Sequence, residues 1–350
     1  MDNHLTLDPY IADTEENLWR VIERFSKTGN DLGSFTEFLK TDFAQKVVLL
    51  IGWDQISGSL SPFMHTYSSY LNNNPFLYTL FKMTKENRDL GEIFEYIRSE
   101  KKILWANITM PYKIEIFNIL SDLWLLDESA RLVGAVNTIA KKDWEVRWYN
   151  TDMYWVLNPV MDALWEKVNS IKKWYVLWAG WAARAAIAAL LQLWIHDITI
   201  FNRTDQTMIN LVNHFNSKEA REVLKNCFSI KMVEYDIQYD EKSHISEYID
   251  EKGILINTLP FWFKSHLAKY PIREDELKKV FDKITLYFDV VYDMNYPGTP
   301  MSEYVRVHHP DIMICDWIDM VVEQARKWYE MWSGGDKIDA KNIKHIIRSK

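Results

Sequence analysis

Glycine is the residue that this sequence most clearly lacks. The chain has 350 residues but only 11 glycines, where the usual share of about 7% would give roughly 25. Tryptophan departs in the opposite direction, with 16 copies of a residue that is ordinarily rare. Tight turns and close approaches of the backbone to a ligand depend on glycine. The shortage therefore bears on any site that is built from such turns.

Other absences narrow the class of protein. No apolar run reaches the length of a membrane span, and the N-terminal sequence MDNHLTLDPY has neither the basic start nor the apolar stretch of a secretion signal. Cys227 and Cys315 lie far apart and form no metal or redox motif, which indicates a reducing, cytoplasmic location and no metal site. A net charge of −8 argues against nucleic acid as the main partner. We expect a monomer or homodimer that acts on a small molecule.

What is present is a pattern of alternating strands and helices. Hydrophobic residues make up 48% of the chain and charged residues 26%, and the length suffices for two domains. Short apolar runs predict strands at residues 46–52, 76–83, 101–109, 175–177, 197–201, 253–256 and 286–291, with two more inside 135–149. Helices are predicted from Ser61 and over residues 152–164, 182–193, 317–332 and 338–348. This alternation predicts an α/β fold with mostly parallel sheets.

Four polar segments follow these elements in a fixed order. They are residues 57–62 (SGSLSP), 107–113 (NITMPYK), 134–138 (GAVNT) and 150–152 (NTD). Taken singly, each has an ordinary structural interpretation: a serine before a helix caps it, a lysine after a strand is a solvated charge, and Asn or Asp makes a turn. Their joint occurrence, in this order and at this spacing, is a stronger signal that favours a functional site.

This set of segments resembles the shikimate dehydrogenase family, over roughly residues 47–335. The resemblance implies an N-terminal α/β substrate domain, a Rossmann-like NADP-binding domain, and NADPH-dependent reduction of 3-dehydroshikimate to shikimate in aromatic amino acid (chorismate) biosynthesis. Two alternatives stay open. One is an NAD-dependent quinate/shikimate dehydrogenase, and the other, from a different class, is a cofactor-free module that binds a small acid.

The resemblance also implies roles for individual residues. Lys113 and Asp152 correspond to the catalytic pair, which fits a ketone reduction because a proton must be delivered to the oxygen. The residues that correspond to substrate contacts are polar and mostly neutral: Ser59, Ser61, Thr109, Asn137, Asp152, Tyr292 and Gln324. Ser59 and Ser61 correspond to the carboxylate contacts, and Gln324 is expected on a helix near the C-terminus.

A second set of residues corresponds to the nucleotide site. The stretch VLWAGWAARAAI follows a strand and opens a helix, where dinucleotide folds place a glycine-rich turn. The candidate cofactor contacts there are Trp178, Ala179, Gly180, Trp181 and Ala182. About 24 residues later come Asn202, Arg203 and Thr204. An arginine instead of an acid at the end of this strand favours the 2′-phosphate of NADPH over NADH. No second basic residue follows within residues 205–207, so dual specificity stays open.

The motifs divide the chain into four expected parts. Residues 1–45 form a peripheral helical extension, residues 46–160 the substrate-binding and catalytic domain, and residues 161–315 the dinucleotide-binding domain. Residues 316–350 form C-terminal helices that pack back on the substrate domain.

The departures from the family pattern concern one pair of residue types. Tryptophan occupies positions where the family has glycine: Trp105, Trp155, Trp178, Trp181, Trp194, Trp262 and Trp317. Trp332, by contrast, stands where the family has tryptophan. Two explanations compete. Either the chain is a degenerate relative that has lost its cofactor, or these codons are UGA, which some bacterial lineages read as glycine and a common alternative code reads as tryptophan. The retention of Lys113 and Asp152 favours the second.

Overall fold

The computed structural model describes residues 6–41, 45–84, 89–120, 125–142, 145–195, 197–224, 228–235, 244–259, 270–291, 298–333 and 335–349. The chain divides into two compact units. The first unit comprises Met1–Ala130, Ala135–Thr151 and Gln324–Lys350, and the second comprises Arg131–Gly134 and Asp152–Glu323. In the described ranges, no helix combines the length and apolar character needed to cross a membrane.

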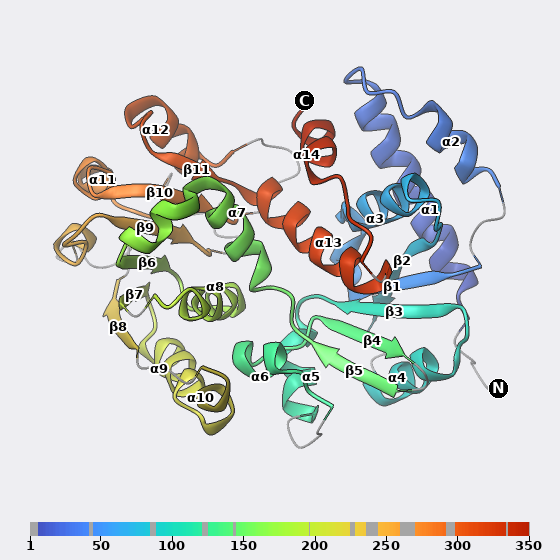
Figure 1. Ribbon diagram of the computed structural model, residues 1–350, viewed down its shortest axis with the longest axis horizontal. Helices are drawn as coiled ribbons and strands as arrows, with labels where there is room; N and C mark the ends of the chain where they lie inside the picture. Colours follow the sequence, from blue (N-terminus) through green and yellow to red (C-terminus); the bar gives the residue numbers. More distant parts are fainter. Residues whose placement is uncertain are drawn as a thin grey trace. The chain divides into compact units, whose positions relative to one another are not determined.

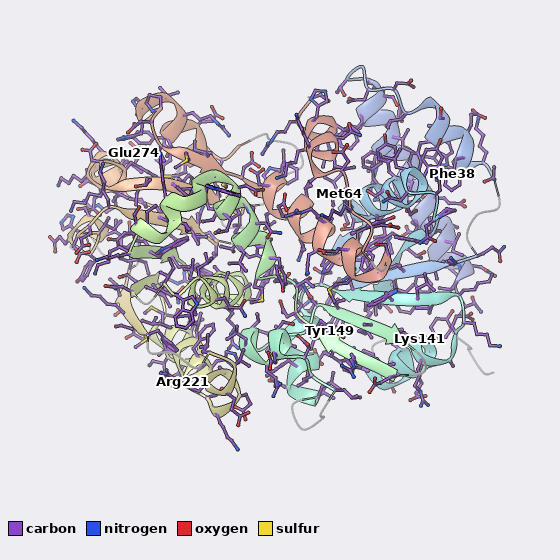
Figure 2. The ribbon with its side chains drawn as sticks, in the orientation of Figure 1. Phe38, Met64, Lys141, Tyr149, Arg221 and Glu274 are labelled. Carbon is purple, nitrogen blue, oxygen red and sulfur yellow. The ribbon has the colours of Figure 1, made fainter. Side chains whose placement is uncertain are left out.

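The first unit is built on a five-stranded sheet in the order β2-β1-β3-β4-β5. Its strands are β1 Val47–Trp53, β2 Leu77–Met83, β3 Ile103–Ile108, β4 Thr138–Lys142 and β5 Glu145–Tyr149. The first three are parallel, while β4 and β5 form an antiparallel hairpin (Figure 1) that carries Lys141 and Tyr149 (Figure 2). β1 is buried along all but its last residue, as expected of a central parallel strand with covered faces.

The helices of the first unit follow its strands. They are α1 Asp8–Ser26, α2 Gly33–Leu39, η1 Asp54–Gly58, α3 Ser61–Leu71, α4 Leu90–Ser99, α5 Tyr112–Leu120 and α14 Ala340–Arg348. Two further helices, α6 Glu128–Val133 and α13 Trp317–Ser333, have residues in both units. α3 begins at Ser61 with Pro62 in its first turn, as predicted from the sequence.

The N-terminal helix α1 is part of the first unit's packing. Leu18, Val21, Ile22 and Phe25 are buried and recur at helical spacing, so they form one apolar face. On the polar side, Thr14 Oγ1 accepts a hydrogen bond of 2.8 Å from the backbone N–H of Leu80. That N–H belongs to the edge strand β2, whose outward backbone groups would otherwise lack a partner. α1 therefore protects the edge of the sheet.

The second unit contains a six-stranded, all-parallel sheet in the order β11-β10-β9-β6-β7-β8. Its strands are β6 Lys173–Leu177, β7 Asp197–Asn202, β8 Ser229–Glu234, β9 Gly253–Asn257, β10 Ile284–Asp289 and β11 Met313–Cys315. The strand order reverses on either side of β6. In open α/β sheets of this kind, ligands bind outside the carboxyl ends of the strands at such a reversal.

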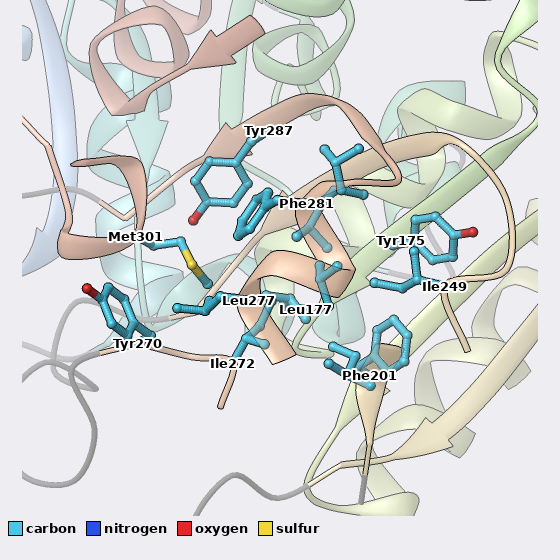
Figure 3. Close-up of a cluster of buried hydrophobic side chains, with 14 of the residues drawn as sticks. Tyr175, Leu177, Phe201, Ile249, Tyr270, Ile272, Leu277, Phe281, Tyr287 and Met301 are labelled. Atoms are coloured by element: carbon cyan, nitrogen blue, oxygen red, sulfur yellow. The ribbon is translucent and has the colours of Figure 1, made fainter. Parts of the chain in front are cut away.

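The helices of the second unit are α7 Tyr154–Leu164, η2 Trp165–Ser170, α8 Trp181–Gln192, α9 Asp205–Phe215, α10 Lys218–Leu224, η3 Ile245–Glu247, α11 Glu274–Phe281 and α12 Pro300–His308. One apolar cluster joins the sheet to α11 and α12. Figure 3 shows Tyr287 and Phe281 beside Leu277 and Met301 in this cluster. Burial of these large side chains is the main favourable contribution to the stability of the unit.

The predicted α/β fold is confirmed. Each strand expected from an apolar run is present, and none of its boundaries differs by more than three residues from the prediction. Among the described residues, seven helices and two strands were not predicted from the sequence: α4, α5, α6, α9, α10, α11, α12, β8 and β11. β8 lies at an edge and is largely exposed, which explains why it lacks a continuous apolar run.

Candidate functional site

The SGSLSP segment forms the turn between β1 and α3. Ser59 follows η1 in an extended conformation, and its Oγ accepts a hydrogen bond of 3.1 Å from the backbone N–H of Ser61. The carbonyl oxygen of Ser57 accepts hydrogen bonds from the side chains of Asn17 and Arg20 on α1. Sequence reasoning found no function for α1, because a helical pattern does not show which loop the helix will contact. In the structure α1 holds the serine segment in place.

The NITMPYK segment is attached to β1 at the end of β3. The backbone N–H of Thr109 donates to the carbonyl oxygen of Ile51 at 2.9 Å. A Cβ added to Gly52 would lie 2.4 Å from Cγ2 of Thr109, so this approach requires glycine. Lys113 is the second residue of α5 and only 5% exposed. Its carbonyl oxygen accepts from the N–H of Val136 at 2.9 Å, which joins this segment to GAVNT.

Asn137 of the GAVNT segment is fully buried and bonded on both sides of its amide. Its Oδ1 accepts from the N–H of Thr151 at 2.9 Å and from Oγ1 of Thr138 at 2.8 Å. Its Nδ2 donates to Oγ1 of Thr151 at 3.1 Å. Because the orientation of the amide is fixed by these bonds, the side chain is preorganised before any ligand arrives. The same bonds connect GAVNT to the NTD segment.

A buried tyrosine completes a polar network among the motifs, which we call the motif network. Tyr78 on β2 donates from its hydroxyl to Oδ1 of Asn107 at 2.8 Å. Nδ2 of Asn107 donates to the carbonyl oxygen of Asn137 and to Oγ1 of Thr138, both at 3.1 Å. The Tyr78 hydroxyl is also hydrogen-bonded to Ser61. Its one proton points at Asn107, so Ser61 is the donor in that bond.

Burial raises the pKa of Tyr78 well above its usual value, so the hydroxyl stays protonated and can hold this network together. The structure thus connects Ser61, Thr138 and Asn137 through Tyr78 and Asn107. Sequence reasoning missed Tyr78 because it lies within an apolar strand and outside every motif. An alternating strand pattern indicates burial, but it does not identify the partner of a buried hydroxyl.

The remaining catalytic and substrate candidates have different outcomes. Asp152 is 1% exposed at the beginning of the second unit, and its carbonyl oxygen accepts from the N–H of Trp155. Lys113 belongs to the first unit, so the pairing of these two side chains stays a prediction. Gln324 lies on α13, on a helix as expected. Tyr292 lies outside the described residues.

The candidate nucleotide loop lies at the carboxyl edge of the second unit's sheet. It consists of Trp178, Ala179 and Gly180, between the end of β6 and the start of α8. β7 is the parallel neighbour of β6 and ends at Asn202, so Arg203 and Thr204 follow it at the same edge. Arg203 is exposed. The structure therefore brings together the two cofactor segments that the sequence predicted.

The side chains of this loop do not fit a dinucleotide. A pyrophosphate at a helix N-terminus is held by bare backbone N–H groups. Trp178 has a φ of 81°, and its indole Cδ1 lies 3.3 Å from the Cβ position of Gly180, the N-cap of α8. Trp181 is the first residue of that helix. The Trp178 indole thus lies beside Gly180, where glycine would leave room for phosphate, and Trp181 adds a second indole at the first residue of the helix, although the backbone has the required turn.

Comparison with known proteins supports one family for both units. The family model for the substrate binding domain of shikimate dehydrogenase matches residues 50–139. The NADP(+) shikimate dehydrogenase of Nitrosopumilus maritimus is 29% identical over 289 residues, which is 83% of this chain and 93% of that protein. The enzyme of the same name from Clostridium beijerinckii is 29% identical over 288 residues, 81% of this chain and 90% of that protein.

Solved structures agree with the sequence matches. A shikimate dehydrogenase in complex with NADP+ has a TM-score of 0.67 at 25% identity, and the match covers 87% of this chain and 94% of that one. The shikimate 5-dehydrogenase of Listeria monocytogenes, in complex with shikimate and NAD, has a TM-score of 0.66 at 25% identity, with 88% and 97% covered. The fold, the motif network and the extent of these matches lead to the same conclusion: over both units, the chain is similar to the shikimate dehydrogenase family.

Proposed function

We propose that the protein is an NADP-dependent shikimate dehydrogenase that reduces 3-dehydroshikimate to shikimate, a step of chorismate and aromatic amino acid biosynthesis. The observation that carries this proposal is the motif network of the first unit. It joins Ser61 to Asn137 by hydrogen bonds through the fully buried side chains of Tyr78, Asn107 and Thr138. Neutral donors and acceptors of this kind suit a ligand with several hydroxyl groups and one carboxylate.

The first unit is assigned to substrate binding. Ser59 and Ser61 bind the carboxylate. They lie two residues apart in the turn that leads into α3, where Ser59 Oγ accepts from the N–H of Ser61 and α1 holds the nearby carbonyl oxygen of Ser57. Thr109 and Asn137 bind ring hydroxyls together with Asp152, Tyr292 and Gln324. In support, the N–H of Thr109 donates to β1, and both the oxygen and the nitrogen of the Asn137 side-chain amide are hydrogen-bonded to Thr151.

Lys113 and Asp152 are assigned to proton transfer at the ketone oxygen of the substrate. Both side chains are almost completely buried, and a titratable pair away from bulk water is suited to general acid–base catalysis. An ammonium group can donate a proton to the ketone oxygen and a carboxylate can accept one, so the two residue types suit this step. Replacement of either residue is expected to reduce turnover more than substrate affinity.

The second unit is assigned to the nicotinamide cofactor. Trp178, Ala179, Gly180, Trp181 and Ala182 form the phosphate-binding turn, and Asn202, Arg203 and Thr204 form the ribose-binding segment. Arg203 favours NADP, because a guanidinium group pairs with a 2′-phosphate. The relatives from Nitrosopumilus and Clostridium carry NADP(+) in their names, which supports the same choice. In this proposal the first unit binds substrate and the second unit, which begins at Asp152 in the main part of its chain, binds cofactor.

The proposal is tested by following NADPH consumption with 3-dehydroshikimate, and NADP+ reduction with shikimate or quinate. The chain as written and the double variant Trp178→Gly/Trp181→Gly are compared, because the two indoles obstruct the cofactor loop. Turnover of shikimate in excess of quinate by the double variant is the expected result. A double variant that binds NADP+ and turns over neither acid would contradict the proposed function.

A further inference from the structure

The residues with positive φ show a pattern that extends beyond the candidate active site. In the described part of the chain, the non-glycine residues with positive φ are Asn73, Trp165, Trp178 and Trp194. Asparagine is one of the non-glycine residues that adopt the left-handed conformation most often, because its short polar side chain can hydrogen-bond to the nearby backbone. Tryptophan lacks such a group, and its Cβ crowds the backbone carbonyl in this conformation. Tryptophan accounts for 16 of 350 residues, so three positions out of four far exceed its share.

Trp194 occupies a glycine position at the end of α8. The N–H of Ile195 donates to the carbonyl oxygen of Leu190 at 3.1 Å, and the N–H of Trp194 to that of Leu191 at 3.3 Å. These two bonds define a Schellman motif, in which the residue at the place of Trp194 is left-handed and usually glycine. Its φ is 59° and its side chain is 71% exposed. The indole therefore contributes little packing in return for the backbone strain.

Trp165 is a second such position, at the end of α7. Its backbone has φ 46° and ψ −125°, which is the conformation of the first central residue in a type II′ turn and is dominated by glycine. The side chain is 71% exposed. Trp165 belongs to no sequence motif and was not among the glycine positions expected from the family pattern. The structure identifies it by conformation alone.

Trp178 is the third position, and the only one of the three in a functional loop. A chain that had lost its cofactor would accumulate varied replacements at the cofactor loop, and it would gain nothing from tryptophan at two exposed helix ends. The occurrence of tryptophan at all three positions is instead explained by a single codon that is read as glycine in the organism. Trp105, Trp155 and Trp317 do not have positive φ, so their backbone gives no such argument, and Trp262 lies outside the described residues.

We propose that residues 165, 178 and 194 are glycine in the functional protein, together with residue 181 of the same phosphate loop, because their codons are read as glycine. This inference rests partly on the proposed function at residues 178 and 181, and on backbone conformation alone at residues 165 and 194. It turns the loop from WAGW into GAGG, which has the glycines that a dinucleotide needs. The misfit between loop and cofactor is then a property of the written sequence only.

Trp332 provides a matched control within the same chain. Its ring lies 4.7 Å from that of His65, 5.7 Å from that of Tyr78 and 6.2 Å from that of Phe76, measured between centroids. It thus packs in an aromatic cluster of the first unit, as a genuine tryptophan does. It stands where the family pattern also has tryptophan. Trp332 is therefore expected to have a UGG codon.

The gene and the native protein test the inference directly. UGA is expected at codons 165, 178, 181 and 194 and UGG at codon 332, and UGG at codon 165 or 194 would overturn the proposal. Trypsin releases residues 174–184 as one peptide, because Lys173 precedes it and Arg184 ends it. Mass spectrometry of the protein from its native host should find this peptide lighter by at least two tryptophan-to-glycine differences. The mass of the written peptide would be evidence against it.

A stability measurement separates this inference from the proposed function. Trp165→Gly and Trp194→Gly are each expected to raise the midpoint of thermal unfolding, by about 2–4 °C, because strain is relieved and little packing is lost. Trp332→Gly should lower the midpoint, because it opens a cavity. If the first two changes lowered it as the control does, the inference would fail whatever the enzyme assays showed. Stabilisation without any activity would leave the glycine assignment intact and remove only the proposed function.

Discussion

The two units differ in how far their candidate sites keep the residue types that the family pattern predicts. In the first unit, the described motif residues keep their expected types and are joined by a hydrogen-bond network through Tyr78 and Asn107. In the second unit the strand order and the turn after β6 are those of a dinucleotide fold, but indoles occupy the turn. The fold therefore accepts tryptophan at a glycine position of this turn. A phosphate site does not, because phosphate binding depends on backbone N–H groups that no side chain covers.

The strongest test of this difference is to restore the loop. The chain as written should bind NADPH undetectably, and Trp178→Gly/Trp181→Gly should restore binding and turnover together, because the pyrophosphate can then reach the N-terminus of α8. Isothermal titration of both forms with NADPH measures the effect. Trp165→Gly/Trp194→Gly is the control, and it should not restore binding. Micromolar binding by the tryptophan form would show that the loop is not obstructed.

In the Trp178→Gly/Trp181→Gly variant, replacement of Lys113 should have the next largest effect on turnover. Lys113→Ala is expected to lower kcat by at least about a hundredfold, the lower range for lost general acid–base catalysis, with a much smaller change in KM. Steady-state kinetics with shikimate and NADP+ measures both. Lys141→Ala is the control, because Lys141 lies on β4 of the same unit and donates to the carbonyl oxygens of Ile97 and Glu100. A Lys113→Ala variant with near-normal kcat would remove this lysine from the mechanism.

A smaller effect is expected from the ribose segment of the second unit. Arg203→Ala should weaken NADPH binding by about tenfold to a hundredfold, the loss of a charged hydrogen bond of about 1.5–3 kcal/mol. NADH binding should change little, since it has no 2′-phosphate. Arg221→Ala on α10 is the control, with a guanidinium that lies 4.2 Å from the ring of Phe228. Equal losses for the two cofactors would show that Arg203 does not recognise the phosphate.

The smallest effect tests the motif network of the first unit. Tyr78→Phe removes one hydroxyl and leaves Oδ1 of Asn107 without its donor, at a cost of about 1–3 kcal/mol in stability. Because Ser61 also loses its partner, KM for shikimate should rise several-fold while kcat changes less. Tyr329→Phe is the control, since that hydroxyl bonds Asn72 and the carbonyl oxygen of Ser68, outside the motifs. Similar KM values for the two variants would argue that the network does not position Ser61.

Much of the site could be predicted from order and spacing alone. The segments around Ser59, Thr109, Asn137 and Asp152 follow the strands and helices that the apolar pattern predicted, and the cofactor segments share one edge of the second sheet. Asn17 and Tyr78 were missed. Each acts through a partner distant in sequence, Ser57 and Asn107 respectively, and a single sequence contains no signal for such a pairing.

By itself, the sequence determined the α/β class, the order of the elements and the likeness to one family, because apolar periodicity and motif spacing are local properties of the chain. Only the tertiary structure decided which backbone groups the side chains bond and where φ is positive. Trp165 illustrates the reason. The sign of φ at the end of a helix depends on the direction in which the chain must leave it, and that direction is set by the packing of the whole unit.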